Sequence, residues 1–268
     1  MKQQKFPKIM GIVNVTPDSF SDGGLFVQKD VAIEQAMKLI EDGADILDIG
    51  GESSRPNAAE ISVEEEKRRV IPVVEGIRKI NSSVEISIDT VKYEVAKAAL
   101  NAGATIINDI SGLSLDIRLA TLAEEKNVPL ILMHIQGTPR TMQINPTYSN
   151  VVEDVFDELS KTIALAKSFG VKNVMADIGI GFGKTAEHNW TLLKNIKRFE
   201  KLGVPMILGL SRKSFLGKLL GIDVPKERDF ATAMLHSLLL EAKLEIIRVH
   251  EVSQIVTLRK LWEKLKNG

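Results

Sequence analysis

The sequence predicts a (β/α)8 barrel, the TIM-barrel fold, in one domain spanning residues 1–268. Three observations support this prediction. Eight short apolar segments recur along the chain, each is followed by a segment with helical spacing, and the eight pairs fill about 250 residues, the usual length of such a barrel. A doubly wound open sheet is the rival architecture. No Pro/Ser-rich linker or change of composition divides the chain.

The apolar segments are too short to be helices and lack strict alternation, which is typical of strands buried on both faces of a parallel sheet. The predicted strands are 9–13, 46–49, 85–88, 105–107, 129–133, 173–176, 205–208 and 246–249.

Helical periodicity marks the segments between the strands. Four glycines stand shortly before strands, where the end of a helix favours a left-handed residue: Gly43, Gly103, Gly170 and Gly203. Three sets share one helix face each: Ile33, Ala36, Met37 and Ile40; Val152, Val155, Phe156, Leu159 and Ile163; and Leu258, Leu261, Trp262 and Leu265. The last set could pack on the barrel or form a subunit interface, and barrel packing is favoured.

Composition limits the chemistry. The 268 residues contain 35 Lys+Arg, 35 Asp+Glu and no cysteine, so the sequence excludes disulfides, thiolate nucleophiles and cysteine metal sites. A net charge of zero gives no indication of nucleic-acid binding. No apolar run reaches the roughly 18 residues that span a membrane, and residues 1–8 do not resemble a secretory signal. We expect a cytoplasmic protein with no nucleic-acid or membrane partner.

Polar residues or glycines follow every predicted strand: Asn14; Asp48 and then Ser53, Ser54 and Arg55; Asp89; Asn108; His134; Asp177; Lys213; and Arg248 with His250. Each alone has a structural explanation, such as a helix cap for Asp89 or a packing role for His134. In a barrel, however, they meet at one mouth, where active sites of this fold lie.

The residue types at this mouth suggest a ligand. Arg55, Lys213 and Arg248, with His250, suit a phosphate or diphosphate, together with a hard cation such as Mg²⁺. A second set consists of hydrogen-bond acceptors that could bind the N–H edge of a flat heterocycle: Asp89, Asn108 and Asp177.

Two motifs are misleading. Residues 179–185 resemble a P-loop, but the first glycine that this motif requires is replaced by Ile178. We interpret this stretch as a tight backbone wall beside the ligand. The four histidines are not spaced as in zinc hydrolases. Two polar, Gly- and Ser-rich segments, about 15–29 and 50–64, are either solvent loops or flaps over the mouth.

At this point the motifs resemble those of the dihydropteroate synthase family. The matching segments are residues 9–24, 43–56, 89–90, 108–109, 133–137, 179–184, 211–214 and 248–250, so the resemblance covers nearly the whole chain in order. It implies a TIM barrel of folate synthesis, usually a homodimer. Such enzymes join 4-aminobenzoate to 6-hydroxymethyl-7,8-dihydropterin diphosphate, releasing dihydropteroate and pyrophosphate.

The resemblance also implies roles for individual residues. The diphosphate would be held by Asn14, which also binds Mg²⁺, and by Ser54, Arg55, Arg248 and His250. The pterin would be held by Asp89, Asn108, Met133, Asp177 and Lys213. The aminobenzoate would be framed by Phe20, Pro56, Phe182 and Ser214. The catalytic set would be Asp22, Arg55, Asp89, Lys213, Arg248 and His250.

Three positions depart from the usual family pattern. Ser54 replaces Thr, Ile178 replaces Pro and Glu251 replaces Asp, and none removes a proposed catalytic group. Two alternatives stay open at this point: a related barrel that transfers the methyl group of methyltetrahydrofolate, and a barrel that binds pterins without catalysis. Arg55, Arg248 and the Asn14 loop favour the synthase, because a methyltransferase needs no diphosphate site.

Overall fold

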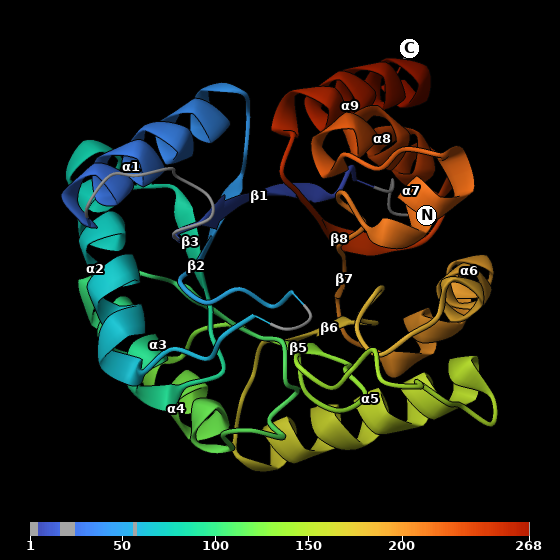
Figure 1. Cartoon of the computed structure of the whole chain (residues 1–268), viewed down its shortest axis with the longest axis horizontal. Coiled ribbons are helices and arrows are strands. Elements are labelled where there is room, and N and C mark those ends of the chain that lie inside the picture. The colour runs from blue at the N-terminus through green and yellow to red at the C-terminus, as the bar shows by residue number, and fades with distance from the viewer. Residues whose placement is uncertain (1–4, 17–24, 56–57, 268) are drawn as a thin grey trace.

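The computed structural model describes residues 5–16, 25–55 and 58–267, and it shows eight parallel strands closed into a barrel in the order β1 to β8 (Figure 1). The strands are β1 (Lys8–Asn14), β2 (Ile46–Gly50), β3 (Glu85–Asp89), β4 (Ile106–Asp109), β5 (Leu130–Met133), β6 (Val174–Asp177), β7 (Met206–Leu208) and β8 (Leu244–Val249). Strand β8 pairs with β1, so the barrel is closed. The predicted TIM barrel is confirmed, and the open sheet was the wrong alternative.

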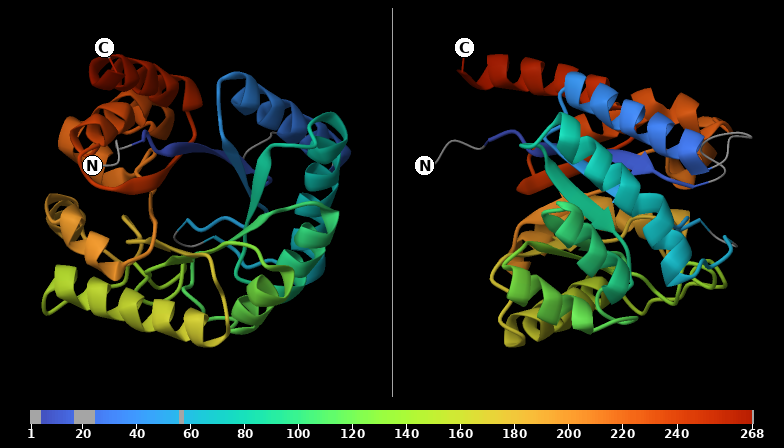
Figure 2. Two further views of the ribbon diagram at one scale, coloured as in Figure 1. Left: turned by 180° about the vertical axis from the view of Figure 1, so that it is seen from behind. Right: turned by 90° about the vertical axis from the view of Figure 1, so that its left-hand side faces the viewer.

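Helices surround the barrel, as Figure 2 shows from behind and from the side. They are α1 (Leu25–Glu41), α2 (Val63–Ile80), α3 (Tyr93–Ala102), α4 (Arg118–Lys126), α5 (Val151–Ser168), α6 (Ala186–Lys194), α7 (Ser214–Leu220), α8 (Asp229–Leu238) and α9 (Val252–Asn267), with 3-10 helices η2 (Ile196–Leu202) and η3 (Pro225–Arg228). The four predicted helix-ending glycines all have positive φ.

The strand predictions are correct to within one or two residues. Four strands, β4 to β7, begin one residue later than predicted. For β5 and β7 the predicted first residue is a proline, which has no N–H for the ladder. The proline carbonyls still take part: Pro129 accepts from Ile107 N at 3.0 Å, and Pro205 from Ala176 N at 2.9 Å.

The first predicted flap, 15–29, was too long. Helix α1 already begins at Leu25, so the last part of that segment is helical. Residues 17–24 lie outside the described part of the chain. The second predicted flap, 50–64, lies between Gly50 at the end of β2 and Val63 at the start of α2, so its last two residues are also helical. Ser62 caps α2, since its hydroxyl accepts from Glu65 N at 3.2 Å.

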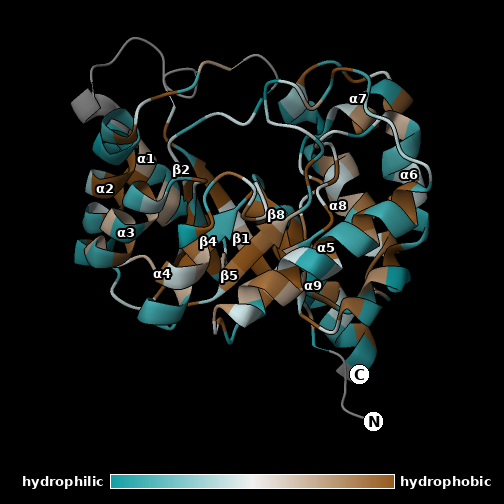
Figure 3. Ribbon diagram, turned by 90° about the horizontal axis from the view of Figure 1, so that it is seen from below, coloured by the Kyte–Doolittle hydropathy of each residue, from teal (hydrophilic) through white to brown (hydrophobic). Residues whose placement is uncertain are grey.

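The core has two parts. Most apolar side chains fill the space between strands and helices, and Figure 3 shows hydrophobic residues concentrated around the central strands. A separate cluster of buried side chains fills the interior of the barrel: Met10, Ile46, Ile106, Ile131, Ile207 and Ile246, with Met175 packed against it. This plug closes the lower part of the barrel.

The C-terminal helix packs on the barrel. Leu258 and Trp262 pack against the core, and the Trp262 ring meets Phe6 edge-on with 5.8 Å between centroids. Leu261 and Leu265 are exposed. No helix in the described ranges is both long and apolar enough to cross a membrane.

Candidate active site

A polar layer lies directly above the apolar plug, toward the carboxyl ends of the strands. Side chains two residues apart in a strand point to the same face. The residues two positions after plug residues therefore also face the barrel interior: Asp48 after Ile46, Asn108 after Ile106, Met133 after Ile131, Asp177 after Met175 and Arg248 after Ile246. Neighbouring strands align them: Asp89 pairs with Asn108, and Met133 with Asp177.

A cavity of about 430 Å³ opens at this end of the barrel. Eight of the residues predicted for the site line it: Asn14, Ser54, Arg55, Asp89, Phe182, Lys213, Arg248 and His250. They come from six separate strand ends and the loops that follow them, which the barrel brings together.

Arg248 is held between two carboxylates. Its Nε donates to Asp48 Oδ2 at 2.6 Å, and its Nη2 donates to Asp89 Oδ2 at 2.8 Å. Asn108 Nδ2 donates to the same Asp48 oxygen at 3.1 Å. Burial opposes the charge, but Asp48 and Asp89 raise the pKa of Arg248 above its usual value. The guanidinium is therefore a fixed cation.

The sequence analysis placed Asp48 among the polar strand-end residues at the mouth but gave it no role in the site. Asp48 is fully buried, and its Oδ1 has no hydrogen-bond partner among the described residues. An aspartate inside an apolar strand that is buried on both faces was the available signal, because such a charge is costly unless it is paired. Its position two residues after Ile46 directs it into the barrel interior.

The two acidic residues expected at the heterocycle are hard to ionise. Burial, and then the nearby charge of Asp48, raise the pKa of Asp89 to about 7, while Arg248 acts in the opposite direction. Burial also raises the pKa of Asp177, although Gly179 N donates to its Oδ1 at 2.7 Å. Strongly shifted carboxyl groups in a cavity are typical of functional sites.

Lys213 lies between a carboxylate and an aromatic ring. Its Nζ lies 4.0 Å from the centroid of the Phe182 ring, a cation–π contact. Burial lowers the pKa of Lys213 to about 8 against the opposing effect of Asp177. A Cβ at Gly181, which has a φ of +85°, would lie 3.1 Å from the Lys213 side chain. The Gly-rich loop thus approaches this lysine closely because it lacks a side chain there.

His250 is a neutral hydrogen-bond donor. Ser211 Oγ accepts from His250 N at 3.1 Å and lies 2.8 Å from His250 Nδ1. Burial and then the surrounding guanidinium and ammonium groups lower the pKa of His250 to about 3. In a neutral imidazole that accepts the Ser211 proton on Nδ1, the other nitrogen, Nε2, carries the hydrogen.

Lys184 explains why the P-loop resemblance fails. Its ammonium group is buried and donates to the carbonyls of Gly179 and Phe182, both at 2.9 Å, and it lies 2.8 Å from His134 Nδ1. The Lys184 ammonium group therefore fixes the shape of the Gly-rich loop and joins the loop to the residue that follows β5. It is not available for a phosphate. His134 is buried and hydrogen-bonded, as predicted for a packing residue.

The other predicted residues divide into two groups. Asn108, Met133 and Asp177 are buried in the polar layer and do not line the cavity, and Ser214 is exposed at the start of α7, next to Lys213. Phe20, Asp22 and Pro56 lie outside the described residues, so their predicted roles stay predictions. Asp89 is not a helix cap, because α3 begins after Lys92.

Comparisons with known proteins match these features. A family described as pterin binding enzyme matches residues 10–250. The dihydropteroate synthase of Haemophilus influenzae is 45% identical over 265 residues, covering 98% of this chain and 95% of the relative.

Solved structures agree. The Xanthomonas albilineans dihydropteroate synthase with 4-aminobenzoic acid superimposes with a TM-score of 0.91 at 40% identity, over 97% of this chain and 93% of that one. A structure of the Xanthomonas albilineans enzyme in complex with 7,8-dihydropteroate has a TM-score of 0.87 at 38% identity. The match covers 97% of this chain and 94% of that one.

Proposed function

Because the chain belongs to the pterin-binding enzymes, and among them to the dihydropteroate synthases, we propose that the polar layer and the cavity above it are its catalytic centre. The chain is a transferase of folate synthesis that condenses 6-hydroxymethyl-7,8-dihydropterin diphosphate with 4-aminobenzoate. The observation that carries the assignment of the site is the convergence of Arg55, Lys213 and Arg248 with Asp89 on one cavity.

The pterin ring occupies the polar layer in this proposal. Asp89, Asn108 and Asp177 provide oxygen acceptors for the N–H groups at its edge, and Lys213 donates to a ring acceptor. Met133, which is buried beside Asp177 in the strand register, packs against the flat ring. Because these groups already face the interior, the ring replaces water without moving the strands.

The diphosphate occupies the cavity mouth. Arg55, Arg248 and the Nε2–H of His250 provide donors of the kind that phosphate oxygens prefer, and Ser54 adds a hydroxyl. Arg248 is held by Asp48 and Asp89, and His250 by Ser211, before the substrate arrives. They therefore stabilise the negative charge that develops on the leaving group without first being reordered.

The reaction is dissociative in this proposal. The bond between the pterin methylene carbon and the diphosphate oxygen breaks first, and its electron pair leaves with pyrophosphate. Pterin nitrogen stabilises the resulting cation, and Asp89 offsets its charge. The lone pair of the arylamine then forms the C–N bond, and the amine releases one proton to water. An arylamine is neutral at pH 7, so no strong general base is required.

The residues present fit a magnesium ion shared with the substrate. Asn14 lines the same cavity as Arg55 and Arg248. The described part of the chain contains no group of three or more His, Cys, Asp or Glu side chains that could enclose a metal. One amide oxygen, completed by diphosphate oxygens and water, is a typical magnesium environment. When bound, Mg²⁺ would neutralise charge on the leaving diphosphate.

The aminobenzoate lies near the rim. Phe182 and Ser214, with Phe20 and Pro56, are the residues proposed to frame it. Phe182 stacks beneath the Lys213 ammonium group, so one aromatic face is already positioned near the proposed pterin site.

The decisive experiment measures pyrophosphate release by the purified protein with Mg²⁺ and the dihydropterin diphosphate, with and without 4-aminobenzoate. Release that requires aminobenzoate, with an equal amount of dihydropteroate, supports the proposed site chemistry. Release without aminobenzoate would mean that water captures the cation. No release, with pterin still bound, would contradict the proposal.

We also propose that the enzyme is a homodimer. Three large apolar side chains lie exposed on one stripe of α8, four residues apart: Phe230, Met234 and Leu238, which are 66%, 45% and 78% exposed. Helix α7 adds exposed Leu219 and Leu220. Light scattering after gel filtration should give twice the mass of the chain, and Phe230→Glu with Leu238→Glu should give one chain. A monomeric unsubstituted protein would refute the dimer.

A cytoplasmic location is part of the same proposal. A diphosphate ester carries several negative charges and does not cross a bilayer unaided. The enzyme must therefore work in the compartment where its substrate is made, and we place both in the cytoplasm.

A further inference from the structure

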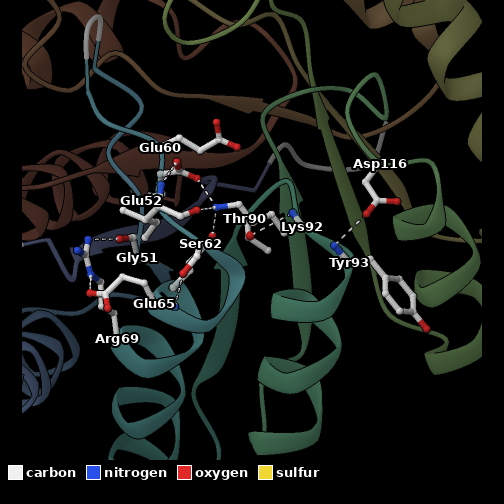
Figure 4. Close-up of polar contacts among 12 residues, drawn as sticks. Gly51, Glu52, Glu60, Ser62, Glu65, Arg69, Thr90, Lys92, Tyr93 and Asp116 are labelled. Atoms are coloured by element: carbon white, nitrogen blue, oxygen red, sulfur yellow. Dashed lines mark hydrogen bonds and ion pairs between the residues drawn. The ribbon is translucent and has the colours of Figure 1, made fainter.

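The β2–α2 loop, which carries Ser54 and Arg55, is closed at its base by a small hydrogen-bonded ring. Glu52 lies near the start of the loop and Ile61 near its end. Glu52 Oε1 accepts from Ile61 N at 3.1 Å. Lys92 Nζ donates to Glu52 Oε2 at 2.7 Å and to Ile61 O at 3.0 Å, as Figure 4 shows in part. One ammonium group therefore joins both ends of the loop.

The same ammonium group also anchors the loop to α2. Lys92 Nζ donates to Glu66 Oε2 at 2.6 Å. The Glu66 side chain is only 1% exposed, and its Oε1 has no hydrogen-bond partner among the described residues. Burial opposes the charge, but Glu52 and Glu66 raise the pKa of Lys92. Lys92 is thus a permanent cation that neutralises a buried carboxylate.

The main chain at Lys92 is fixed independently of the loop. Its N–H donates to Thr90 Oγ1 at 3.2 Å, and the next N–H, of Tyr93, donates to Asp116 Oδ2 at 3.2 Å (Figure 4). Lys92 also follows Asp89 by three residues, at the start of α3. The turn that presents Asp89 to the polar layer is therefore the turn that holds the loop.

Lys92 does not line the main cavity, whereas Glu52, Ser54 and Asp89 do. It lines a second, smaller cavity of about 220 Å³ that shares Glu52, Ser53, Ser54 and Asp89 with the first. Lys92 must therefore act on any ligand of the main cavity through the residues that it holds.

We propose that Lys92 is a positioning residue: it clamps Glu52 and Ile61 so that Ser54 and Arg55 are held over the cavity in register with Asp89. What the loop binds rests on the proposed function, namely the diphosphate. The clamp itself rests on the contacts alone. It acts on the placement of the diphosphate donors and leaves the pterin acceptors of β4 and β6 untouched.

The first test needs no substrate. Hydrogen exchange of the peptide containing residues 52–61 is compared between the unsubstituted protein and Lys92→Met. We expect exchange of the Ile61 amide to be at least about tenfold faster in Lys92→Met, since local opening sets this rate. Lys97→Met, which changes an exposed lysine on the same helix, is the matched control and should exchange as the unsubstituted protein does. Unchanged exchange in Lys92→Met would overturn the proposal.

Glu52→Gln provides a second variant. It weakens the contact between Lys92 and Glu52, which holds the loop. It keeps the ion pair between Lys92 and Glu66, so the buried Glu66 carboxylate stays neutralised. If Lys92→Met does not fold, Glu52→Gln alone decides the question. Faster exchange of residues 52–61 supports the clamp, and unchanged exchange overturns it.

The second test separates positioning from a purely structural role. In both variants the KM for the dihydropterin diphosphate should rise about 10- to 100-fold, because small displacements of positioning groups have effects of this size. The affinity for 6-hydroxymethylpterin, which has no diphosphate, should stay within about threefold of the unsubstituted value. Equal losses for both ligands would overturn the proposal.

The two tests fail in different ways. If the unsubstituted protein makes no dihydropteroate, the proposed site chemistry fails, but the exchange measurement still decides whether Lys92 holds the loop. If the unsubstituted protein is active and the exchange rates do not differ, only the clamp is wrong.

Discussion

Asp48 and Arg248 lie 200 residues apart in the chain, yet Arg248 Nε donates to Asp48 Oδ2 at 2.6 Å in the centre of the barrel. The contact joins β2 to β8 across β1, so it exists only once the barrel is closed. Asp48 also accepts from Asn108, and it thereby holds both Arg248 and Asn108. It connects the part of the site proposed for the diphosphate with the part proposed for the pterin.

Replacing Asp48 tests this connection. Asp48→Asn keeps the shape of the side chain but removes a charge beside Asp89, whose pKa also responds to Arg248, Glu66 and Asp109. Loss of a neighbouring negative charge lowers the pKa of a carboxyl group. The acidic limb of the pH profile of kcat/KM should therefore move to lower pH. The value of kcat should also fall about tenfold, because Arg248 loses one of the two carboxylates that hold it. An unmoved limb would show that Asp48 does not influence Asp89.

Arg248→Lys keeps the charge but loses the planar fork that reaches Asp48 and Asp89 and that is proposed to bind the diphosphate. Turnover should fall about 100-fold, the usual effect of removing one donor that stabilises developing charge. Binding of a pterin without a diphosphate should survive. The matched control is Arg259→Lys, because Arg259 pairs with Asp45 at the opposite end of β2 and should not affect turnover. Equal loss of turnover and pterin affinity would contradict the role given to Arg248.

Lys213 should give the pH profile of kcat/KM a basic limb. Its lowered pKa of about 8 means that the ammonium group loses its proton above that pH in the free enzyme. The pH profile of kcat/KM, which reports free-enzyme groups, should fall above about pH 8. Lys213→Met should abolish this limb and weaken pterin binding about 10- to 100-fold, as expected for a lost hydrogen bond from a charged group. A basic limb that persists in Lys213→Met would assign it to another group.

His236 makes stability depend on pH. It is fully buried, and burial lowers its pKa to about 4. The pKa of His236 in the unfolded chain is about 6.5. Between about pH 6.5 and about pH 4, the unfolded chain therefore binds a proton at His236 that the native state does not. Stability should therefore fall as the pH falls through this window, by about 1.4 kcal/mol per pH unit from this residue. His250, whose pKa is also lowered, acts in the same direction.

Urea unfolding between pH 7 and pH 4.5 measures this effect. His236→Gln should be less stable than the unsubstituted protein at pH 7, because the buried packing changes, but its stability should fall less steeply on acidification. The two curves should therefore converge. Parallel curves would show that His236 does not bind a proton on unfolding.

Much of this architecture could be predicted from the sequence, because strands buried on both faces leave short apolar runs and each run ends in a polar residue. The convergence of Asn14, Asp89, Lys213 and Arg248 followed from the topology of a barrel, which brings all strand ends to one mouth. The predicted strand ends were accurate for the same reason: a change from an apolar residue to a polar residue or a glycine, as from Ile88 to Asp89, marks where the core ends.

Contacts between side chains could not be predicted in the same way. Nothing in the sequence around Lys92 indicates that its partners are Glu52 and Glu66, because this depends on how two loops meet after the barrel closes. The pairing of Arg248 with Asp48 was missed for the same reason. Both cases involve charges that are paired because they are buried, and burial is a property of the folded chain rather than of its local sequence.

The plug formed by Met10, Ile46, Ile106, Ile131, Ile207 and Ile246 has a consequence for the order of events during turnover. It closes the barrel beneath the polar layer, so a ligand that contacts Asn108 and Asp177 must approach from the carboxyl ends of the strands. If these two residues bind the pterin and the aminobenzoate lies near Phe182, as proposed, the pterin must bind first. A compound that occupies only the position near Phe182 would then block both the release of a bound pterin and the entry of a new one.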